Sequence, residues 1–287
     1  MILLNTIVQG LLLGGLYALF AAGLSLVFGV MRLVNLAHGD LIVLAAFLIL
    51  SITTSLGLNP FAAVLIAAPI MFAAGWLLQA HVLNRVLDDD LLPPLLVTFG
   101  LSVVIQNALL EGFSADSQKL AAGPIEAASL SFGPLTVGVV PLMTFASAVV
   151  VIFALNQIFY RTALGRAFRA TSDDAVTAGL MGIHAKRVFC IATGIAMVVA
   201  TIAALYLGTR ANFDPSIGPA RLLYAFQAVI IGGLGSLWGT LIGGIVIGLA
   251  QTLGAAVNPE WQILSGHLAF AAILLIRPRG LFPRAND

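Results

Sequence analysis

Polar side chains inside otherwise apolar stretches are the groups of this chain that could contact a solute. Thr98, Ser102 and Gln106 recur at every fourth residue and therefore share one face of a helix. Such a stripe could line a path for a polar solute, and it could equally hold helices together by hydrogen bonds. Gln227 is a further amide in an apolar stretch. These four side chains are candidates for a translocation path.

A second polar group lies in the stretch Asn35-Leu36-Ala37-His38-Gly39-Asp40, whose composition is typical of a broken helix. Irregular backbone at membrane depth is tolerated only where protein or a water-filled cavity satisfies its polar groups. We therefore expect Asn35 and His38 to border the same path.

The reactive side chains do not predict catalysis or metal binding. An intramembrane enzyme needs a nucleophile with a base, or a metal cluster of carboxylates and histidines, and no such constellation is present. The single cysteine, Cys190, lies in an apolar stretch, which favours a small buried hydrophobe. His267 is interpreted as a neutral, hydrogen-bonded packing residue rather than a proton relay. We expect no catalytic site, no metal and no cofactor in this chain.

These residues belong to a chain that is too apolar for a soluble domain. Of its 287 residues, 60% are hydrophobic and 9% are charged, whereas soluble proteins have about 45–50% and about 25%. The formal net charge is +1, so the chain has neither a basic surface for nucleic acid nor an acidic tail. The composition indicates an integral membrane protein surrounded by lipid.

Charge-free gaps locate the spans, because one crossing needs about 20 apolar residues. Two gaps contain turn sequences, at 55–60 and 232–236, and each is predicted to hold two segments. We expect one all-α, polytopic membrane domain over residues 1–287, with broken or half-helices. The expected crossings lie near 3–29, 36–55, 60–81, 91–110, 135–160, 188–209, 222–234, 237–256 and 260–276. Because 222–234 is too short to cross comfortably, eight full spans is the alternative count.

The basic residues predict the orientation of the chain. Nine passes place the N-terminus and the loop 111–133 outside, and the loop 161–187 and the C-terminus in the cytoplasm. Three of the 13 basic residues, Lys119, Arg210 and Arg221, then lie outside, and the other ten, which include Arg284, lie inside. This distribution satisfies the positive-inside rule. The first segment has no basic start, so we expect no cleavable signal peptide there.

The chain shows no means of powering transport itself. Ion-driven carriers usually have ionisable residues within their spans, and these are nearly absent here. Nucleotide hydrolysis needs a Gly-Lys-Ser/Thr motif, and the two lysines follow Gln118 and Ala185. The energy source is therefore expected to be another chain.

The loop 161–187 is the place where such a chain could act. Its carboxylates Asp173 and Asp174 favour a helix start and Gly182 favours a stop, which predicts a short helix at about 172–181. An ordinary positive-inside connector and a docking site for a partner explain this loop equally well from the residues alone.

Glycines at fixed spacing predict close contacts between helices. Gly235, Gly239 and Gly243 recur at every fourth residue, and the pairs Gly244/Gly248 and Gly10/Gly14 have the same spacing. Such ladders let two backbones approach closely in lipid. We expect this packing to occur within the chain rather than between subunits.

Five stretches of the sequence resemble the permease subunits of the ABC importers for branched-chain amino acids, the Liv-type family. They are GLSLVFGVMRLVNLAHGD at 23–40, LLVTFGLSVVIQNALL at 95–110, LGRAFRATSDDAVTAGLMGIHAKRV at 164–188, PSIGPARLLYAFQAVIIGGLGSLWGTLIGGIVIGL at 215–249 and LLIRPRGLFPR at 274–284. The resemblance covers nearly the whole chain, whereas the loop 111–133 departs from the pattern.

The resemblance implies a set of partners. A permease of this type forms half of a transmembrane dimer, commonly with a sister permease, in the bacterial inner membrane. Two cytoplasmic ATPase subunits use ATP and Mg²⁺ to drive it, and a periplasmic binding protein delivers the substrate. The segment 164–188 would couple to the ATPase, with the pattern matched at Asp173, Asp174, Ala178, Gly179 and Gly182. Arg166 and Arg169 would orient the short helix toward an acidic ATPase surface.

The substrate class implied by the resemblance is amino acids, with branched-chain ones first. Permeases for urea, short amides and aromatic carboxylates share the fold and are the alternative within this class. A passive channel is the alternative from another class, and the cytoplasmic helix argues against it because a passive pore needs no ATPase dock. No charge in the sequence is placed to grip an amino acid, so selection is expected mainly at the binding protein.

Overall fold

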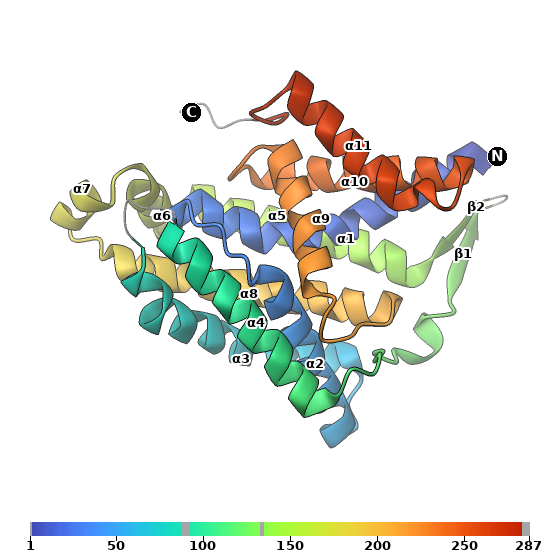
Figure 1. Cartoon of the computed structure of the whole chain (residues 1–287), viewed down its shortest axis with the longest axis horizontal. Coiled ribbons are helices and arrows are strands. Elements are labelled where there is room, and N and C mark those ends of the chain that lie inside the picture. The colour runs from blue at the N-terminus through green and yellow to red at the C-terminus, as the bar shows by residue number, and fades with distance from the viewer. Residues whose placement is uncertain (1, 88–91, 133–134, 283–287) are drawn as a thin grey trace.

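The computed structural model describes residues 2–87, 92–132 and 135–282, and the chain folds into a bundle of helices (Figure 1). The elements are α1 (Ile2–Met31), α2 (His38–Leu56), α3 (Pro60–His81), η1 (Leu83–Arg85), α4 (Leu92–Phe113), η2 (Gly123–Ile125), β1 (Ser129–Phe132), β2 (Leu135–Gly138), α5 (Val139–Arg161), α6 (Ala163–Asp173), α7 (Ala175–Leu180), α8 (Ala185–Arg210), α9 (Gly218–Gly232), α10 (Leu237–Val257) and α11 (Trp261–Ile276). Arg284, position 91 of the expected fourth span and position 133 of the expected outer loop lie outside the described residues.

The expected polytopic helical membrane fold is confirmed. Among the described residues, seven helices are long and apolar enough to cross a membrane, namely α1, α2, α3, α4, α5, α8 and α10. The other two expected segments are also helices, but α9 has 15 residues and α11 has 16. The short segment predicted at 222–234 is thus a half-length helix that begins earlier, at Gly218.

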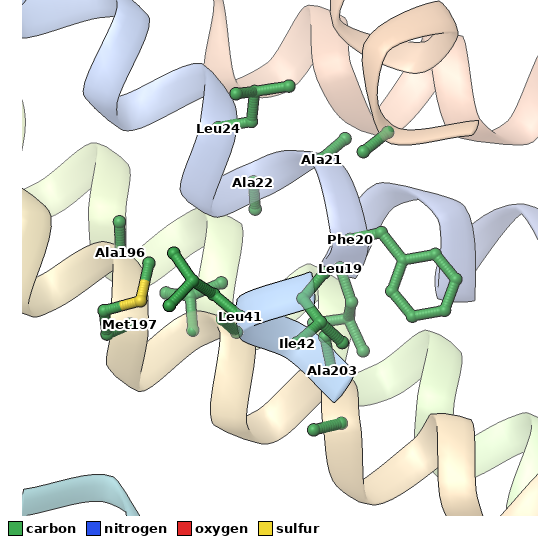
Figure 2. Packing of buried hydrophobic residues seen from close by; sticks show 14 of the residues in the cluster. Leu19, Phe20, Ala21, Ala22, Leu24, Leu41, Ile42, Ala196, Met197 and Ala203 are labelled. Atoms are coloured by element: carbon green, nitrogen blue, oxygen red, sulfur yellow. The ribbon is translucent and has the colours of Figure 1, made fainter. Parts of the chain in front are cut away.

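The core forms around α1 and α8, the two helices that the rest of the protein encloses most completely. Figure 2 shows part of this core, with Leu19 of α1 beside Ile42 of α2 and Ala203 of α8. The helices α3, α4 and α5 lie at the periphery and keep apolar side chains on their outer faces. An apolar outer face is what a lipid environment requires.

Glycines allow α10 to lie directly against α1 and α9. A Cβ on Gly14 of α1 would lie 2.5 Å from the Cα of Ile245, and one on Gly244 would lie 2.6 Å from the carbonyl oxygen of Gly14. On the other side of α10, Gly239 and Gly243 lie against the backbone of α9. Gly235 instead forms the turn between α9 and α10, with φ of +78°.

The two ends of the bundle differ in structure. At one end, on the right of Figure 1, β1 and β2 pair as an antiparallel hairpin near the N-terminus. The segment before the hairpin contacts the carboxyl-terminal end of α8, where the Leu120 N–H donates to the Gly208 carbonyl at 2.9 Å. Lys119 and Glu126 form an ion pair at 2.6 Å, and this hydrogen bond lowers the pKa of Glu126. The opposite end of the bundle carries α6 and α7. We call the end with β1 and β2 the hairpin end, and the end with α6 and α7 the α7 end.

The carboxyl end of α9 is closed by residues that follow α11 in sequence. Leu281 N–H donates to the Ile231 carbonyl at 2.8 Å, and Phe282 N–H donates to the Gly232 carbonyl at 3.2 Å. Gly280, with φ of +79°, makes the turn that brings them there. Carbonyl groups at the end of a helix lack partners within the helix, and these contacts supply them.

Replacing Gly244 tests the packing of α1 against α10. We predict that Gly244→Ala lowers the free energy of unfolding by about 1–3 kcal/mol, because the added methyl group forces two backbones apart. Cys190 is buried, at 3% exposure, so its reaction with a thiol-reactive fluorophore during heating in nanodiscs reports unfolding. Gly100→Ala is the control, since a Cβ there has nothing within 4 Å. Equal unfolding temperatures for the two variants would contradict the prediction.

Candidate functional site

The polar stripe of α4 and the broken segment before α2 meet at one carboxylate, Asp40. Ser102 Oγ donates to Asp40 Oδ2 at 2.6 Å, and Gln106 Nε2 donates to Asp40 Oδ1 at 3.0 Å. Gln106 Nε2 also lies 3.2 Å from Ser102 Oγ, so the three side chains form a closed set. Asp40 has no exposed surface. The sequence separates these groups by some sixty residues, and only the fold brings them together.

Asp40 also lies where two helices begin. It belongs to the first turn of α2, and a Cβ built on Gly218, the first residue of α9, would overlap its Oδ1 atom. A Cβ on Gly39 would likewise overlap the carbonyl group of Gly218. The positive ends of both helix dipoles therefore face this carboxylate, which stabilises its negative charge. Glycine at both positions is a condition for the contact.

Asn35 and His38 hold the irregular segment that precedes α2. Asn35 Oδ1 accepts a hydrogen bond from Ala37 N–H at 3.0 Å. His38 Nε2 lies 2.9 Å from the Phe20 carbonyl oxygen of α1 and must be the donor, because a carbonyl oxygen only accepts. Both side chains are buried. Their polar atoms are thus used to fix the start of α2.

The remaining two path candidates lie apart from Asp40. Thr98 is buried and donates within its own helix, to the Pro94 carbonyl at 2.9 Å. Gln227 of α9 contacts His267 of α11, with 2.6 Å between Nε2 and Nδ1. His267 is hydrogen-bonded and stacked on Tyr224, as expected of a packing histidine. Thr98 and Gln227 therefore stand outside the hydrogen-bonded set around Asp40, and the lining of one path by the six side chains stays a prediction.

The connector between α5 and α8 holds two short helices, which corrects the single helix predicted at 172–181. The expected helix start, at about residue 172, instead continues α6, which ends at Asp173. Asp174 leaves the helical conformation and its Oδ1 atom accepts from Val176 N–H at 2.9 Å and Thr177 N–H at 3.0 Å, so it is the N-cap of α7. The Thr177 hydroxyl also donates to Asp174 Oδ2. This bond, followed by the backbone bonds, lowers the pKa of Asp174. Gly182, with φ of +83°, makes the turn that follows α7.

The outer surface of α7 is apolar although it lies beyond the spans. Val176 is 78% exposed, Leu180 84% and Met181 79%, whereas Ala178 is buried against the rest of the protein. A Cβ on Gly179 would have no atom within 4 Å. We call Val176, Gly179, Leu180 and Met181 the α7 face. Exposed apolar groups of this kind, surrounded by polar residues, are typical of a contact surface.

The charged residues predicted to act with this helix are placed in two ways. Asp173 and Asp174 are exposed directly before α7, and Arg166 is exposed in the first turn of α6. Arg169 instead folds back on α5, where it donates to the Phe159 carbonyl and lies 5.5 Å from the centre of the Tyr160 ring. Arg169 therefore fixes α6 to the end of α5.

No metal site accompanies these features in the described ranges, where no group of three or more His, Cys, Asp or Glu side chains is placed to hold an ion. The features that sequence reasoning missed are the role of Asp40 as the common partner of Ser102 and Gln106, and its contact with Gly218. The spacing of four residues in α4 indicated a shared face, but not what lies opposite it.

Comparison with known proteins matches residues 6–276 to the family described as branched-chain amino acid transport system, permease component. The chain is 28% identical to the high-affinity branched-chain amino acid transport permease BraD of Pseudomonas aeruginosa, over 98% of this chain and 96% of that one. It is 30% identical to the permease LivH of Salmonella typhimurium, with the same shares covered. A second permease of that organism, LivM, is 24% identical over 93% of this chain and 68% of LivM.

Ser102 tests the Asp40 cluster. We predict that Ser102→Ala lowers the free energy of unfolding by about 1.5–3 kcal/mol, because a buried carboxylate loses a donor. The measurement is the unfolding temperature reported by the Cys190 thiol. Asn107→Ala is the matched control on the same helix, since its exposed amide donates only to the Val103 carbonyl, and we expect it to cost less than about 0.5 kcal/mol. A Ser102→Ala protein as stable as the control would contradict the cluster.

Proposed function

The chain belongs to the family of permease components of branched-chain amino acid transport systems, and on this premise we propose how it takes up and moves its substrate. It acts as the permease subunit of an ATP-binding cassette importer for amino acids. Its relatives BraD, LivH and LivM are named as permeases for branched-chain amino acids. Leucine, isoleucine and valine are accordingly the proposed substrates.

The observation that carries the coupling part of the proposal is the α7 face. A permease without a nucleotide-binding motif needs a surface on which a separate ATPase subunit can dock and transmit its conformational change. The α7 face offers apolar side chains at an end of the bundle, and α7 follows α6 directly and is joined to α8 by the short turn 181–184. Force applied to α7 would therefore reach α8, one of the two central helices of the core. A passive channel would have no use for such a surface.

We propose a complex with four further subunits. A sister permease completes the membrane pathway, and the similarity of this chain to both LivH and LivM of one organism supports a partner that is related but different. Two ATPase subunits bind ATP and Mg²⁺ and dock at the α7 end, where Arg166, Asp173 and Asp174 flank the apolar contact. A periplasmic binding protein delivers the amino acid at the hairpin end.

The proposed orientation in the bacterial inner membrane follows from these contacts and from the basic residues. The α7 end lies in the cytoplasm, and the hairpin end with the N-terminus lies outside. ATP-driven closure of the ATPase pair would rock the helices between outward-facing and inward-facing states through α7. No covalent step occurs in this chain.

Gly179 allows a sharp test of coupling, because the chain itself leaves room for a larger side chain there. We predict that Gly179→Leu leaves the unfolding temperature unchanged and weakens ATPase association and leucine uptake about tenfold or more, since overpacking one contact costs about 1–3 kcal/mol. Uptake is measured in proteoliposomes that contain the complete complex.

Gly112→Leu on α4 is the matched control, because a Cβ there also has no atom within 4 Å. It should transport like the wild type. Normal ATPase association and uptake in Gly179→Leu would show that the α7 face is not the docking surface.

Cysteine labelling tests the orientation. In a Cys190→Ala background, Ser117→Cys and Asn212→Cys should react with a membrane-impermeant maleimide in intact spheroplasts, whereas Thr177→Cys should react only after permeabilisation. All three positions are exposed, so accessibility depends on the side of the membrane. The reverse pattern would invert the proposed orientation.

A further inference from the structure

Two arginines and two tyrosines gather inside the bundle, away from Asp40 and from the α7 face. Tyr17 comes from the middle of α1, Arg210 ends α8, and Arg221 and Tyr224 lie one turn apart near the start of α9. Arg210 Nη1 reaches the Leu12 carbonyl of α1, and the Tyr224 ring, one turn beyond Arg221, stacks on Tyr17. We call these four residues the arginine–tyrosine cluster.

The rings of this cluster are held firmly. Tyr17 stacks on Tyr224 with 4.8 Å between ring centres, and Tyr224 stacks in turn on His267 of α11. The Tyr17 hydroxyl donates to Gln251 Oε1 of α10 at 2.5 Å. Residues from α1, α9, α10 and α11 thus form one fixed wall beside the arginines.

The two arginines lack a matching negative charge. Among the described residues, the one ion pair of the chain is Lys119 with Glu126. Arg210 makes a long contact, 3.4 Å, with the Leu12 carbonyl. Asp214, the acidic residue nearest Arg221 in the sequence, accepts from Ser216 and forms no ion pair with Arg221. Leu12 lies about 15 Å along α1 from its start, given a rise of about 1.5 Å per residue, so Arg210 reaches well into a span.

Several buried polar atoms around the cluster also lack partners. They are Arg221 Nε, Gln251 Nε2 and Gln227 Oε1, and the side chains of Gln227 and Gln251 are 2% and 1% exposed. Buried polar groups normally have hydrogen-bond partners, and each exception needs a cause. Unpaired charges within membrane proteins are costly and mark functional sites. Both arginines remain partly exposed, so a ligand can reach them.

The chemistry of these groups specifies the ligand. A guanidinium group presents paired N–H donors that match the two oxygens of a carboxylate. Two such groups beside the Tyr17 hydroxyl would provide the charge and donors for one carboxylate, and the stacked tyrosines provide an apolar surface next to it. The Asp40 cluster is not a site of this kind. Its own carboxylate already accepts from Ser102 and Gln106 and lies against the starts of α2 and α9.

We infer that the arginine–tyrosine cluster binds the α-carboxylate of the amino acid that the importer carries, with Arg210 and Arg221 as the direct ligands. This inference rests on the proposed function. It differs from the expectation that no charge in the chain grips the substrate, because the fold turns Arg210 onto α1 and places Arg221 one turn before Tyr224, whose ring stacks on Tyr17. The site lies toward the hairpin end, where delivery is proposed.

The test uses the complete transporter in proteoliposomes, with uptake of radiolabelled L-leucine and binding-protein-stimulated ATP hydrolysis measured together. We expect Arg210→Gln and Arg221→Gln each to reduce uptake about tenfold or more, because a charged hydrogen bond contributes about 1.5–3 kcal/mol, while ATP hydrolysis and binding-protein affinity persist. Arg221→Lys should recover part of the uptake. Lys119→Gln, at the exposed ion pair of the hairpin end, is the charge-matched control and should transport normally.

A second measurement does not depend on a variant that folds. Photo-leucine, which carries a diazirine in its side chain, is supplied to the wild-type transporter during turnover and illuminated. Peptides that contain Tyr17 or Tyr224 should carry the label, and unlabelled leucine should compete. Label elsewhere in the chain, with none on these peptides, would overturn the inference.

The remaining outcomes separate other ligands from the substrate. Loss of binding-protein affinity in the arginine variants would assign the charges to an acidic protein surface, and a loss of uptake confined to vesicles with phosphatidylglycerol, absent with phosphatidylcholine alone, would assign them to lipid; either result overturns the inference. Unchanged uptake in both Gln variants overturns it as well and leaves the proposed function standing. A wild-type complex that imports no branched-chain amino acid overturns the proposed function itself.

Discussion

Backbone groups freed by an interrupted helix must find partners inside the protein when no water is available to them. Here the interruption before α2 is closed by Asn35 and His38, and the carboxylate of Asp40 is shared among Ser102, Gln106 and the starts of α2 and α9. The position of α9 depends on this contact, because its first residue lies against Asp40. The polar groups at the break thus determine where a half-length helix can begin.

The same short helix joins the other functional regions. Its first turn carries Arg221 and contacts α2, while its last turns, from Ala228 to Gly232, lie against the glycines of α10. The helix α10, which packs against α9, also packs closely against α1. This links α9 to the core that α1 and α8 form. A motion that enters at α7 and travels along α8 ends at Arg210, a member of the arginine–tyrosine cluster. The proposed ATPase contact and the proposed substrate site therefore lie at opposite ends of one helix, α8.

Much of the fold was predictable, because charge-free gaps and turn sequences depend on local composition. The half-length helix, the stripe of α4 and the buried state of Cys190 follow from such patterns. The sequence could not predict which residue from another helix each polar side chain would contact. Spacing placed Ser102 and Gln106 on one face, but Asp40 as their acceptor and Arg221 beside Tyr17 depend on tertiary packing. The break at Asp174 was missed because two adjacent aspartates both suit a helix start, and only the backbone decides between them.

The closure of α9 by Leu281 and Phe282 has a consequence for biosynthesis. Ile231 and Gly232 leave the ribosome about fifty residues before the amide groups that will occupy their carbonyls. Until those residues emerge, a helix of 15 residues has one open end and is too short to span the bilayer unaided. The translocon would therefore release α9 into its final position late, together with α10 and α11, as a single C-terminal insertion unit rather than one helix at a time.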